Sequence, residues 1–468
     1  MSAPDLSDEI MSQLKESGAE KHVTLLLGAG ASTTSGLPGW DELTVRLLMG
    51  SGIVPNEETA NLLLKRQDPL IVVEAARAMH PDDWVRKVRS ALYRGVVSTE
   101  FSPLHLAAVS HLLGGDRGDT SLLTLNFDTL LEEAIERETG EDVLSVSDSA
   151  DSGELFTVHH LHGVVSPTGT KDVILALTDF LEVVNTADSW QLEYLRSAVT
   201  RGAVIIAGTS YRDPDVRQWL HAARQHSPAD HAVLVLLARQ GFDVSSAEFA
   251  NLKDALFKQW EAVGLRAVLL DDHSDAAQVI RELRHVNDPS YMAPQERAAM
   301  IWKHHCEHFE ALQSEYVEAL RLDSTEMRSM LDVDLLNMTI WLSNGKKELV
   351  RWAAEDRIYL DLDSLRAVQT GYDSSWIAGQ ALGADTLLIK DVEPSGTRRW
   401  KSVLAIPIPA PHPHLPTMTA AVLTIGLPGR ANQYEDSKVL WLGLLSEIAD
   451  SWSTRITHAV FEDNRASI

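Results

Sequence analysis

The sequence predicts an α/β domain with a parallel sheet, followed by a smaller α+β domain with an antiparallel sheet. Four short apolar runs each end in glycine or in polar residues, and helix-length segments separate most of them. This pattern is typical of parallel strands, which are buried on both faces and need long connections. Near residue 344, Asn344-Gly345 stands between two apolar runs, which predicts a β-hairpin. The four runs are residues 25–27, 122–125, 157–161 and 203–207.

The first run leads directly into a turn that is rich in glycine and hydroxyl residues. Gly28 ends the strand, Gly30 has no side chain to block a phosphate, and amides at the start of the next helix favour an anion. Hydroxyl side chains can add hydrogen-bond donors. The turn therefore predicts a phosphate-binding site, to which we assign Gly28, Ala29, Gly30, Ser32, Thr33, Gly36, Leu37 and Pro38.

This turn matches the glycine fingerprint of dinucleotide-binding domains incompletely. Thr33 stands at the third glycine position, and no acidic residue follows about 20 positions later. A strand-to-helix turn without a ligand is therefore an alternative when the turn is considered alone.

Polar residues also follow the other three runs. Because ligands of open α/β sheets bind beyond the carboxyl ends of the strands, we expect these residues to meet in one crevice. Alternatively, Asn126 or Asp128 caps the next helix, and His162 is a satisfied histidine at a strand end. His159 and His160 are weaker candidates because they lie closer to the strand interior. The candidates are Asn126 and Asp128 after the second run, His162 after the third, and Gly208, Thr209 and Ser210 after the fourth.

Taken in order, these segments resemble the sirtuin-type NAD-binding fold, which is Rossmann-like. The resemblance extends to about residue 285 and includes residues 28–32 with 36–38, 124–128, 162–163 and 208–210. An ordered set of four motifs is far more specific than any one of them. The resemblance implies that NAD binds in the crevice.

Two departures separate this chain from the protein deacylases of that family. Those enzymes carry Asp-Phe-Arg after a Gly-Ile-Pro turn and Gln at the position of Leu125, whereas Gly39-Trp40-Asp41 follows the turn here. They also build a zinc module on four cysteines, and the one cysteine of this chain, Cys306, lies outside the region of resemblance. The resemblance thus implies the divergent prokaryotic branch, without zinc, whose members include NAD-hydrolysing effectors of antiphage defence.

The implied activity is that of an NAD+ glycohydrolase, which releases nicotinamide and ADP-ribose and acts as a regulated effector of abortive defence. By the same resemblance, His162 is the general base toward a ribose hydroxyl or water, Asn126 orients that water and the ribose, and Asp128 is a polar partner of the nicotinamide half. Histidine suits proton transfer near neutral pH. Two alternatives are a non-enzymatic regulator that senses NAD or ADP-ribose and, less favoured, an NAD-dependent protein deacylase.

The remaining elements of the first domain are helices and two further strands. Residues 40–113 are predicted as a mostly helical insertion that forms a lid or subdomain over the crevice. Runs at 231–238 and 265–270 predict two more parallel strands, and a helix closes the domain near Val286. The predicted domains are the sirtuin-like domain at 1–288, a helical linker at 289–323 and a third region at 324–468.

The third region resembles a GAF sensor domain. Its order is a hairpin, a helix, a second hairpin formed by 402–408 and 420–426, and a terminal helix from about Ser437 with a broad apolar surface. The resemblance implies a nucleotide or another small-molecule signal, and the alternative is a dimerisation module without a ligand. His304 and His308 in the linker lack a third ligand at suitable spacing, so we expect no metal site.

Composition limits the setting of the protein. The formal net charge of −26 repels polyanions and argues against nucleic acid as a main partner. No apolar stretch approaches the ~18 residues of a membrane span, and residues 1–20 do not resemble a signal peptide. A single cysteine fits a reducing compartment. We therefore expect a cytoplasmic protein with no membrane partner, and its apolar linker and terminal helices favour a homo-oligomer.

Overall fold

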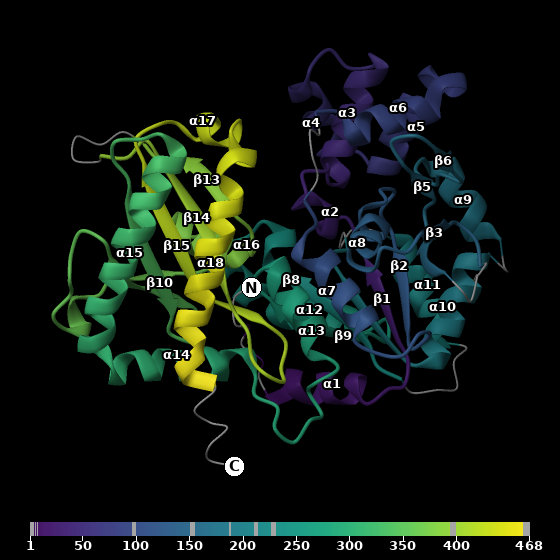
Figure 1. The fold of residues 1–468 in the computed structure, drawn as a ribbon. Coiled ribbons are helices and arrows are strands. Elements are labelled where there is room, and N and C mark those ends of the chain that lie inside the picture. Colours follow the sequence, from purple (N-terminus) through teal and green to yellow (C-terminus); the bar gives the residue numbers. More distant parts are fainter. Residues whose placement is uncertain are drawn as a thin grey trace. The chain divides into compact units, whose positions relative to one another are not determined.

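The computed structural model describes residues 4, 6, 8–95, 100–149, 155–186, 189–209, 214–225, 231–393 and 399–461 (Figure 1). The chain divides into two compact units. The N-terminal unit is Ser12–Arg284, and the C-terminal unit is His285–Ile468 with Met1–Met11. Each unit has a hydrophobic core of its own.

A seven-stranded parallel sheet forms the centre of the N-terminal unit, in the order β3-β4-β2-β1-β7-β8-β9. β1 lies between β2 and β7, so the chain builds the sheet outward from β1 in both directions. β1, β7 and β8 are buried at every position, as expected for strands covered on both faces. The strands are β1 (Val23–Leu27), β2 (Thr120–Thr124), β3 (Val143–Val146), β4 (Phe156–His160), β7 (Ala203–Ala207), β8 (Val233–Ala238) and β9 (Arg266–Leu270).

Helices cover both faces of this sheet, which confirms the predicted α/β class. α7, α8 and α13 pack together along one face, and α10, α11 and α12 share a core with the other face. A small hairpin of β5 (Val164–Val165) and β6 (Thr170–Lys171) lies apart from the main sheet. The helices are α1 (Asp8–Gly18), α7 (Pro103–Leu113), α8 (Leu130–Thr139), α9 (Leu177–Asn185), α10 (Trp190–Arg201), α11 (Pro214–Gln225), α12 (Ser246–Glu261) and α13 (His273–Glu282).

The predicted helical insertion forms a subdomain with its own apolar core (Figure 1). This core includes Leu48, Val73 and Val88, and Phe127 from the loop after β2 packs into it. The insertion ends earlier than predicted: α7 packs on α13 and β2, because its apolar residues surround the helix and need the sheet as a second partner. The short helix α2 (Gly30–Thr33) precedes the insertion, whose helices are α3 (Trp40–Ser51), α4 (Glu57–Leu64), α5 (Pro69–Met79) and α6 (Trp84–Tyr93).

The C-terminal unit is built on a six-stranded antiparallel sheet, in the order β12-β11-β10-β15-β14-β13, which confirms the predicted α+β class. α14, α15 and α18 share the core on one face, and α16 packs on the other face. The elements are α14 (Pro294–Glu307), α15 (Phe309–Leu331), β10 (Asn337–Ser343), β11 (Glu348–Ala354), β12 (Ala367–Gln369), α16 (Ile377–Ala384), β13 (Leu388–Asp391), β14 (Ser402–Ala410), β15 (Met418–Leu427), α17 (Ala431–Glu435) and α18 (Lys438–Phe461).

Residues 289–323, which the sequence analysis treats as a linker, are part of this second core. The helical segment is interrupted at His308, between α14 and α15. Ile301 and Tyr316, one from each helix, are fully buried. The rings of His304 and His308 stack with centroids 4.4 Å apart. Among the described residues, no group of three or more His, Cys, Asp or Glu side chains is placed to hold a metal ion.

The predicted hairpin at Asn344-Gly345 is confirmed, with a four-residue loop between β10 and β11. Gly345 and Lys347 both have positive φ, and the Asn344 side chain accepts a hydrogen bond from the Lys346 amide at 2.8 Å. None of the described helices is long and apolar enough to cross a lipid bilayer.

Candidate functional site

The carboxyl ends of four neighbouring strands are aligned in the N-terminal sheet. Leu27 pairs with Thr124 on one side and with Ala207 on the other, and Thr124 pairs with His160. The segments that follow β1, β2, β4 and β7 therefore leave the sheet at the same edge, as the sequence predicts.

A cavity of about 250 Å³ lies at this edge, and residues of the insertion form part of its wall. Six of the predicted site residues line it, from the turn after β1, the loop after β2 and the loop after β4: Ala29, Ser32, Pro38, Asn126, Asp128 and His162. Most of the other wall residues are apolar and come from the insertion and the segment before α10: Trp40, Leu43, Asp68, Pro69, Leu70, Leu92, Leu125, Phe127, Ile174, Leu175 and Phe180.

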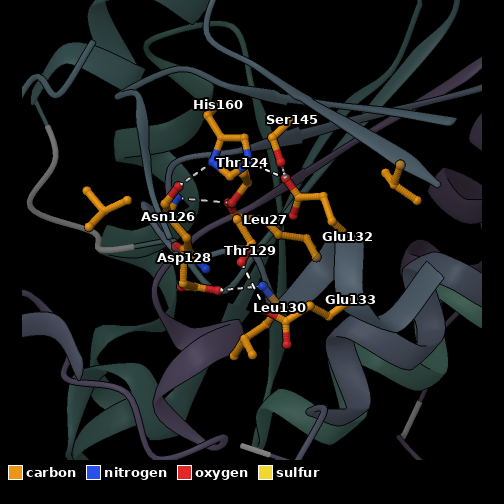
Figure 2. A network of polar contacts seen from close by, with 12 residues as sticks. Leu27, Thr124, Asn126, Asp128, Thr129, Leu130, Glu132, Glu133, Ser145 and His160 are labelled. Carbon is orange, nitrogen blue, oxygen red and sulfur yellow. Dashed lines mark hydrogen bonds and ion pairs between the residues drawn. The ribbon is translucent and has the colours of Figure 1, made fainter. Parts of the chain in front are cut away.

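Asn126 is held at three of its four hydrogen-bonding groups (Figure 2). Its backbone amide donates to the Thr124 hydroxyl at 3.0 Å, and its backbone carbonyl accepts from Nδ1 of His160 at 2.8 Å. Its side-chain Nδ2 donates to Oγ of Ser32 at 2.8 Å. The remaining group, Oδ1, is buried and has no partner among the described residues. An unpaired buried acceptor in a cavity wall is suited to a ligand donor.

Asp128 lies beside Asn126 and is 6% exposed. Its Oδ1 accepts from the Leu130 amide at 3.2 Å, so it caps the turn that leads into α8, which was the alternative role considered for it. Burial raises the pKa of Asp128 to about 6, although hydrogen bonds from Ser32 and Leu130 oppose the rise. A carboxyl group with this pKa exchanges protons close to neutral pH.

His160 and Glu132 form a buried pair next to Asn126 (Figure 2). Nε2 of His160 lies 2.6 Å from Oε1 of Glu132, which also accepts from the Ser145 hydroxyl. Burial alone would lower the pKa of His160, but the Glu132 carboxylate raises it above its usual value. His160, a weaker candidate from the sequence, contacts the Asn126 backbone without lining the cavity. No sequence signal pairs it with Glu132, because that contact depends on how α8 packs on β4.

His162 owes its position to the glycine that follows it. Gly163 has a φ of +87°, and a Cβ there would lie 2.2 Å from the Asp172 carbonyl oxygen. The chain can therefore fold back, so that the Ile174 amide donates to the His162 carbonyl at 2.9 Å. The ring centroid of His162 lies 6.4 Å from that of Phe127 and 6.0 Å from that of Trp219.

The glycines after β1 serve packing inside the protein. A Cβ on Gly28 would lie 2.5 Å from Thr209 Cα, and one on Gly30 would lie 2.8 Å from the His273 ring. The amides of Gly28 and Gly30 donate to the carbonyls of Ala207 and Gly208, at 3.0 and 2.7 Å. These two amides join the turn to the end of β7.

We expect Gly30→Ala to destabilise the N-terminal unit by about 1–3 kcal/mol, because the new methyl group overlaps the buried His273 ring. His273→Ala in the same background is expected to recover part of the loss, since it removes that overlap. Denaturant unfolding of the two single variants and the double variant measures the coupling. Strictly additive losses would contradict this account of the glycine.

The other predicted residues lie near the cavity without lining it or fall outside the described residues. Gly36 has a φ of +87°, which fits a left-handed turn, and the Thr33 hydroxyl donates to the Gly30 carbonyl at 3.3 Å. Ser210 lies outside the described residues. The described residues that do not line the cavity are Gly28, Gly30, Thr33, Gly36, Leu37, Gly208 and Thr209.

Comparison with known proteins finds a family model that matches the central region of the chain. Residues 120–268 match the family model of the SIR2-like domain. That segment contains Asn126, Asp128, His162 and Gly208, whereas the glycine turn and the insertion precede it. The comparison with curated proteins returned no match.

Solved structures give neighbours for both units. A Sir2 homologue in complex with NAD is 16% identical over 60% of this chain and 94% of that chain, with a TM-score of 0.34. A Sir2 homologue in complex with ADP-ribose has the same identity and TM-score and is covered over 99% of its length. A GAF sensor protein from Burkholderia vietnamiensis is 13% identical over 36% of this chain and 96% of that chain, with a TM-score of 0.22.

Proposed function

We propose that the SIR2-like domain hydrolyses NAD+ to nicotinamide and ADP-ribose. The observation that carries this proposal is the unpaired Oδ1 of Asn126, buried in a cavity that Asp128 and His162 also line. Because its other three polar groups are hydrogen-bonded, Asn126 is held in place. Its Oδ1 can therefore accept a hydrogen bond from a ligand hydroxyl or water and fix the position of that group. The match to the SIR2-like family model and the NAD complex of a Sir2 homologue support NAD as that ligand.

In the proposed reaction, water attacks C1′ of the nicotinamide ribose, and the bond from C1′ to the pyridinium nitrogen breaks. Nicotinamide leaves with the electron pair of that bond and is neutral without protonation. The attacking water loses one proton, which His162 accepts, while Asn126 Oδ1 orients the water and the ribose. Asp128 is the polar partner of the nicotinamide half.

The size and lining of the cavity fit one end of a dinucleotide. Its volume of about 250 Å³ is below the roughly 300–1,000 Å³ of sites that enclose drug-sized ligands. Aromatic walls from Trp40, Phe127 and Phe180 suit a flat ring and exclude bulk water from the reacting carbon. The adenosine half then lies outside this cavity, beyond the strand ends.

Asn126→Ala is expected to lower nicotinamide release from NAD+ about 100-fold, because the acceptor that orients the water is lost. Chromatography of products from labelled NAD+ measures the rate. Asn251→Ala on the exposed side of α12 is the matched control and should keep the wild-type rate.

The same assay decides between the proposed activity and its alternatives. Saturable NAD+ binding without any product, under every oligomeric or activated condition, would favour a sensing regulator. Deacetylation of an acetyl-lysine peptide at a rate exceeding NAD+ hydrolysis would favour a deacylase.

We further propose a setting for the activity: a cytoplasmic homo-oligomer that depletes NAD+ as an effector of abortive antiphage defence. The GAF-like unit would bind a nucleotide or other small-molecule signal that releases the activity. This proposal depends on the sequence resemblance to defence effectors and on the consistency of the C-terminal unit with a GAF-like fold. Cellular NAD+ measured after phage challenge should fall with the wild-type chain and stay constant with the Asn126→Ala variant.

A further inference from the structure

The pair of His160 and Glu132 is the most deeply buried ionisable pair beside the cavity. His160 is 0% exposed and Glu132 is 3% exposed, and neither residue lines the cavity. They come from the end of β4 and from the first turn of α8. A buried ion pair costs desolvation energy that an apolar pair avoids, so its presence here calls for a specific role.

Both nitrogens of the His160 ring face oxygen acceptors. Nδ1 lies 2.8 Å from the Asn126 carbonyl, and Nε2 lies 2.6 Å from the Glu132 carboxylate. A carbonyl oxygen cannot donate, so Nδ1 carries a proton, and an ionised Glu132 requires a second proton on Nε2. Against the effect of burial, the pKa of Glu132 is lowered by His160 and the pKa of His160 is raised by Glu132, so both shifts favour an imidazolium that bridges a charge on α8 and the backbone of Asn126.

We propose that His160 and Glu132 are positioning residues for the reaction, which act through Asn126; this inference rests on the proposed function. The imidazolium holds the Asn126 carbonyl, while Thr124 holds its amide and Ser32 holds its Nδ2. These three contacts leave Oδ1 as the one polar group of Asn126 that a ligand can use. Glu132 fixes the ring, and Ser145 in turn fixes Glu132.

His160 differs from the other buried histidine of the strand because its ring contacts the backbone of a proposed site residue, Asn126. His159, the preceding residue of β4, is also buried, but its ring packs on Tyr194 at 4.4 Å and its Nδ1 contacts the Asp148 carbonyl at 3.2 Å. It lies on the other face of the strand from His160, because successive side chains of a strand alternate. His159 is therefore the natural control for His160.

The test compares His160→Ala, His160→Gln and the control His159→Ala in the full-length chain. We expect His160→Ala to lower kcat about 100-fold with a smaller change in KM, because a loosened Asn126 misplaces the attacking water. His160→Gln, which keeps one donor toward the Asn126 carbonyl, is expected to recover part of kcat. His159→Ala is expected to lower the melting temperature without lowering kcat. A wild-type kcat in folded His160→Ala would overturn the proposal.

A double variant covers the case in which a lone buried charge prevents folding. His160→Gln with Glu132→Gln replaces the ion pair by two neutral amides that can hydrogen-bond to each other. We expect this variant to unfold near the wild-type temperature and still to have a reduced kcat, which a purely structural role would not produce. Wild-type kcat in the double variant would contradict positioning by the imidazolium.

A second readout needs no turnover. In the wild-type chain labelled with 15N at histidine and asparagine, we expect both ring nitrogens of His160 to be protonated at pH 7. The side-chain amide signals of Asn126 should shift in His160→Ala and remain in His159→Ala. A neutral His160 ring, or unchanged Asn126 signals, would overturn the inference. Absence of nicotinamide release by the wild type would instead contradict the proposed function. The His160 and Asn126 signals would still show whether His160 positions Asn126.

Discussion

Replacing His162 with alanine is expected to reduce nicotinamide release about 100- to 10,000-fold, because the proposed general base at the cavity wall is lost. The effect should appear in kcat, since the base acts on a proton that leaves during the reaction. Initial rates of nicotinamide release at saturating NAD+, followed by chromatography, give the value.

The matched control is His231→Ala. His231 lies before β8, at the amino end of the sheet, and pairs with Glu20 at 2.8 Å. It is therefore on the opposite edge from the strand ends that form the site, and its variant should keep the wild-type rate. A His162→Ala protein that is folded and within threefold of the wild-type rate would exclude His162 as the base.

The sequence predicts the parallel sheet well because apolar strands and polar strand ends leave strong local signals. The alignment of residues 27, 124, 160 and 207 follows from parallel pairing alone. The limits of the insertion could not be predicted in the same way. α7 is as helical as α6, and its place on the sheet depends on apolar residues on different faces of the helix, such as Leu104 and Val109.

The cavity residues that the sequence predicts are those that directly follow strands. Asn126, Asp128 and His162 stand out because polar residues interrupt apolar runs there. The supports behind them could not be predicted. Glu132 looks like a solvated helix residue and His160 like a strand residue, and their contact appears only when α8 packs on β4.

The glycine turn has a packing role that its sequence pattern does not reveal. The pattern at Gly28 and Gly30 is read from sequence as room for a phosphate, since glycine commonly serves close ligand approach. In the structure the same lack of Cβ makes room for Thr209 and for the His273 ring. Both uses are compatible with the same sequence, so the packing role became visible only from how β1 lies against β7 and α13.

Asp128→Asn is expected to stabilise the protein at pH 8 while lowering nicotinamide release about 100-fold. Burial raises the pKa of Asp128 from 3.8 to about 6, so the folded chain binds this proton more tightly than the unfolded chain. The free energy of unfolding contributed by this group therefore falls as pH rises from about 4 to about 6 and is constant above that range. At pH 8 the buried carboxylate costs on the order of 3 kcal/mol.

Asparagine removes that cost without removing the acceptor. Its Oδ1 can still accept from the Leu130 amide and the Ser32 hydroxyl, which contact Asp128 in the wild type. Thermal unfolding at pH 4.5 and pH 8 measures the effect, and the gain in melting temperature should be larger at pH 8. An equal gain in melting temperature at both pH values would mean that the charge of Asp128 does not destabilise the folded protein. If Asp128→Asn both stabilises the protein and inactivates it, the carboxylate of Asp128 serves the reaction and not the stability of the fold.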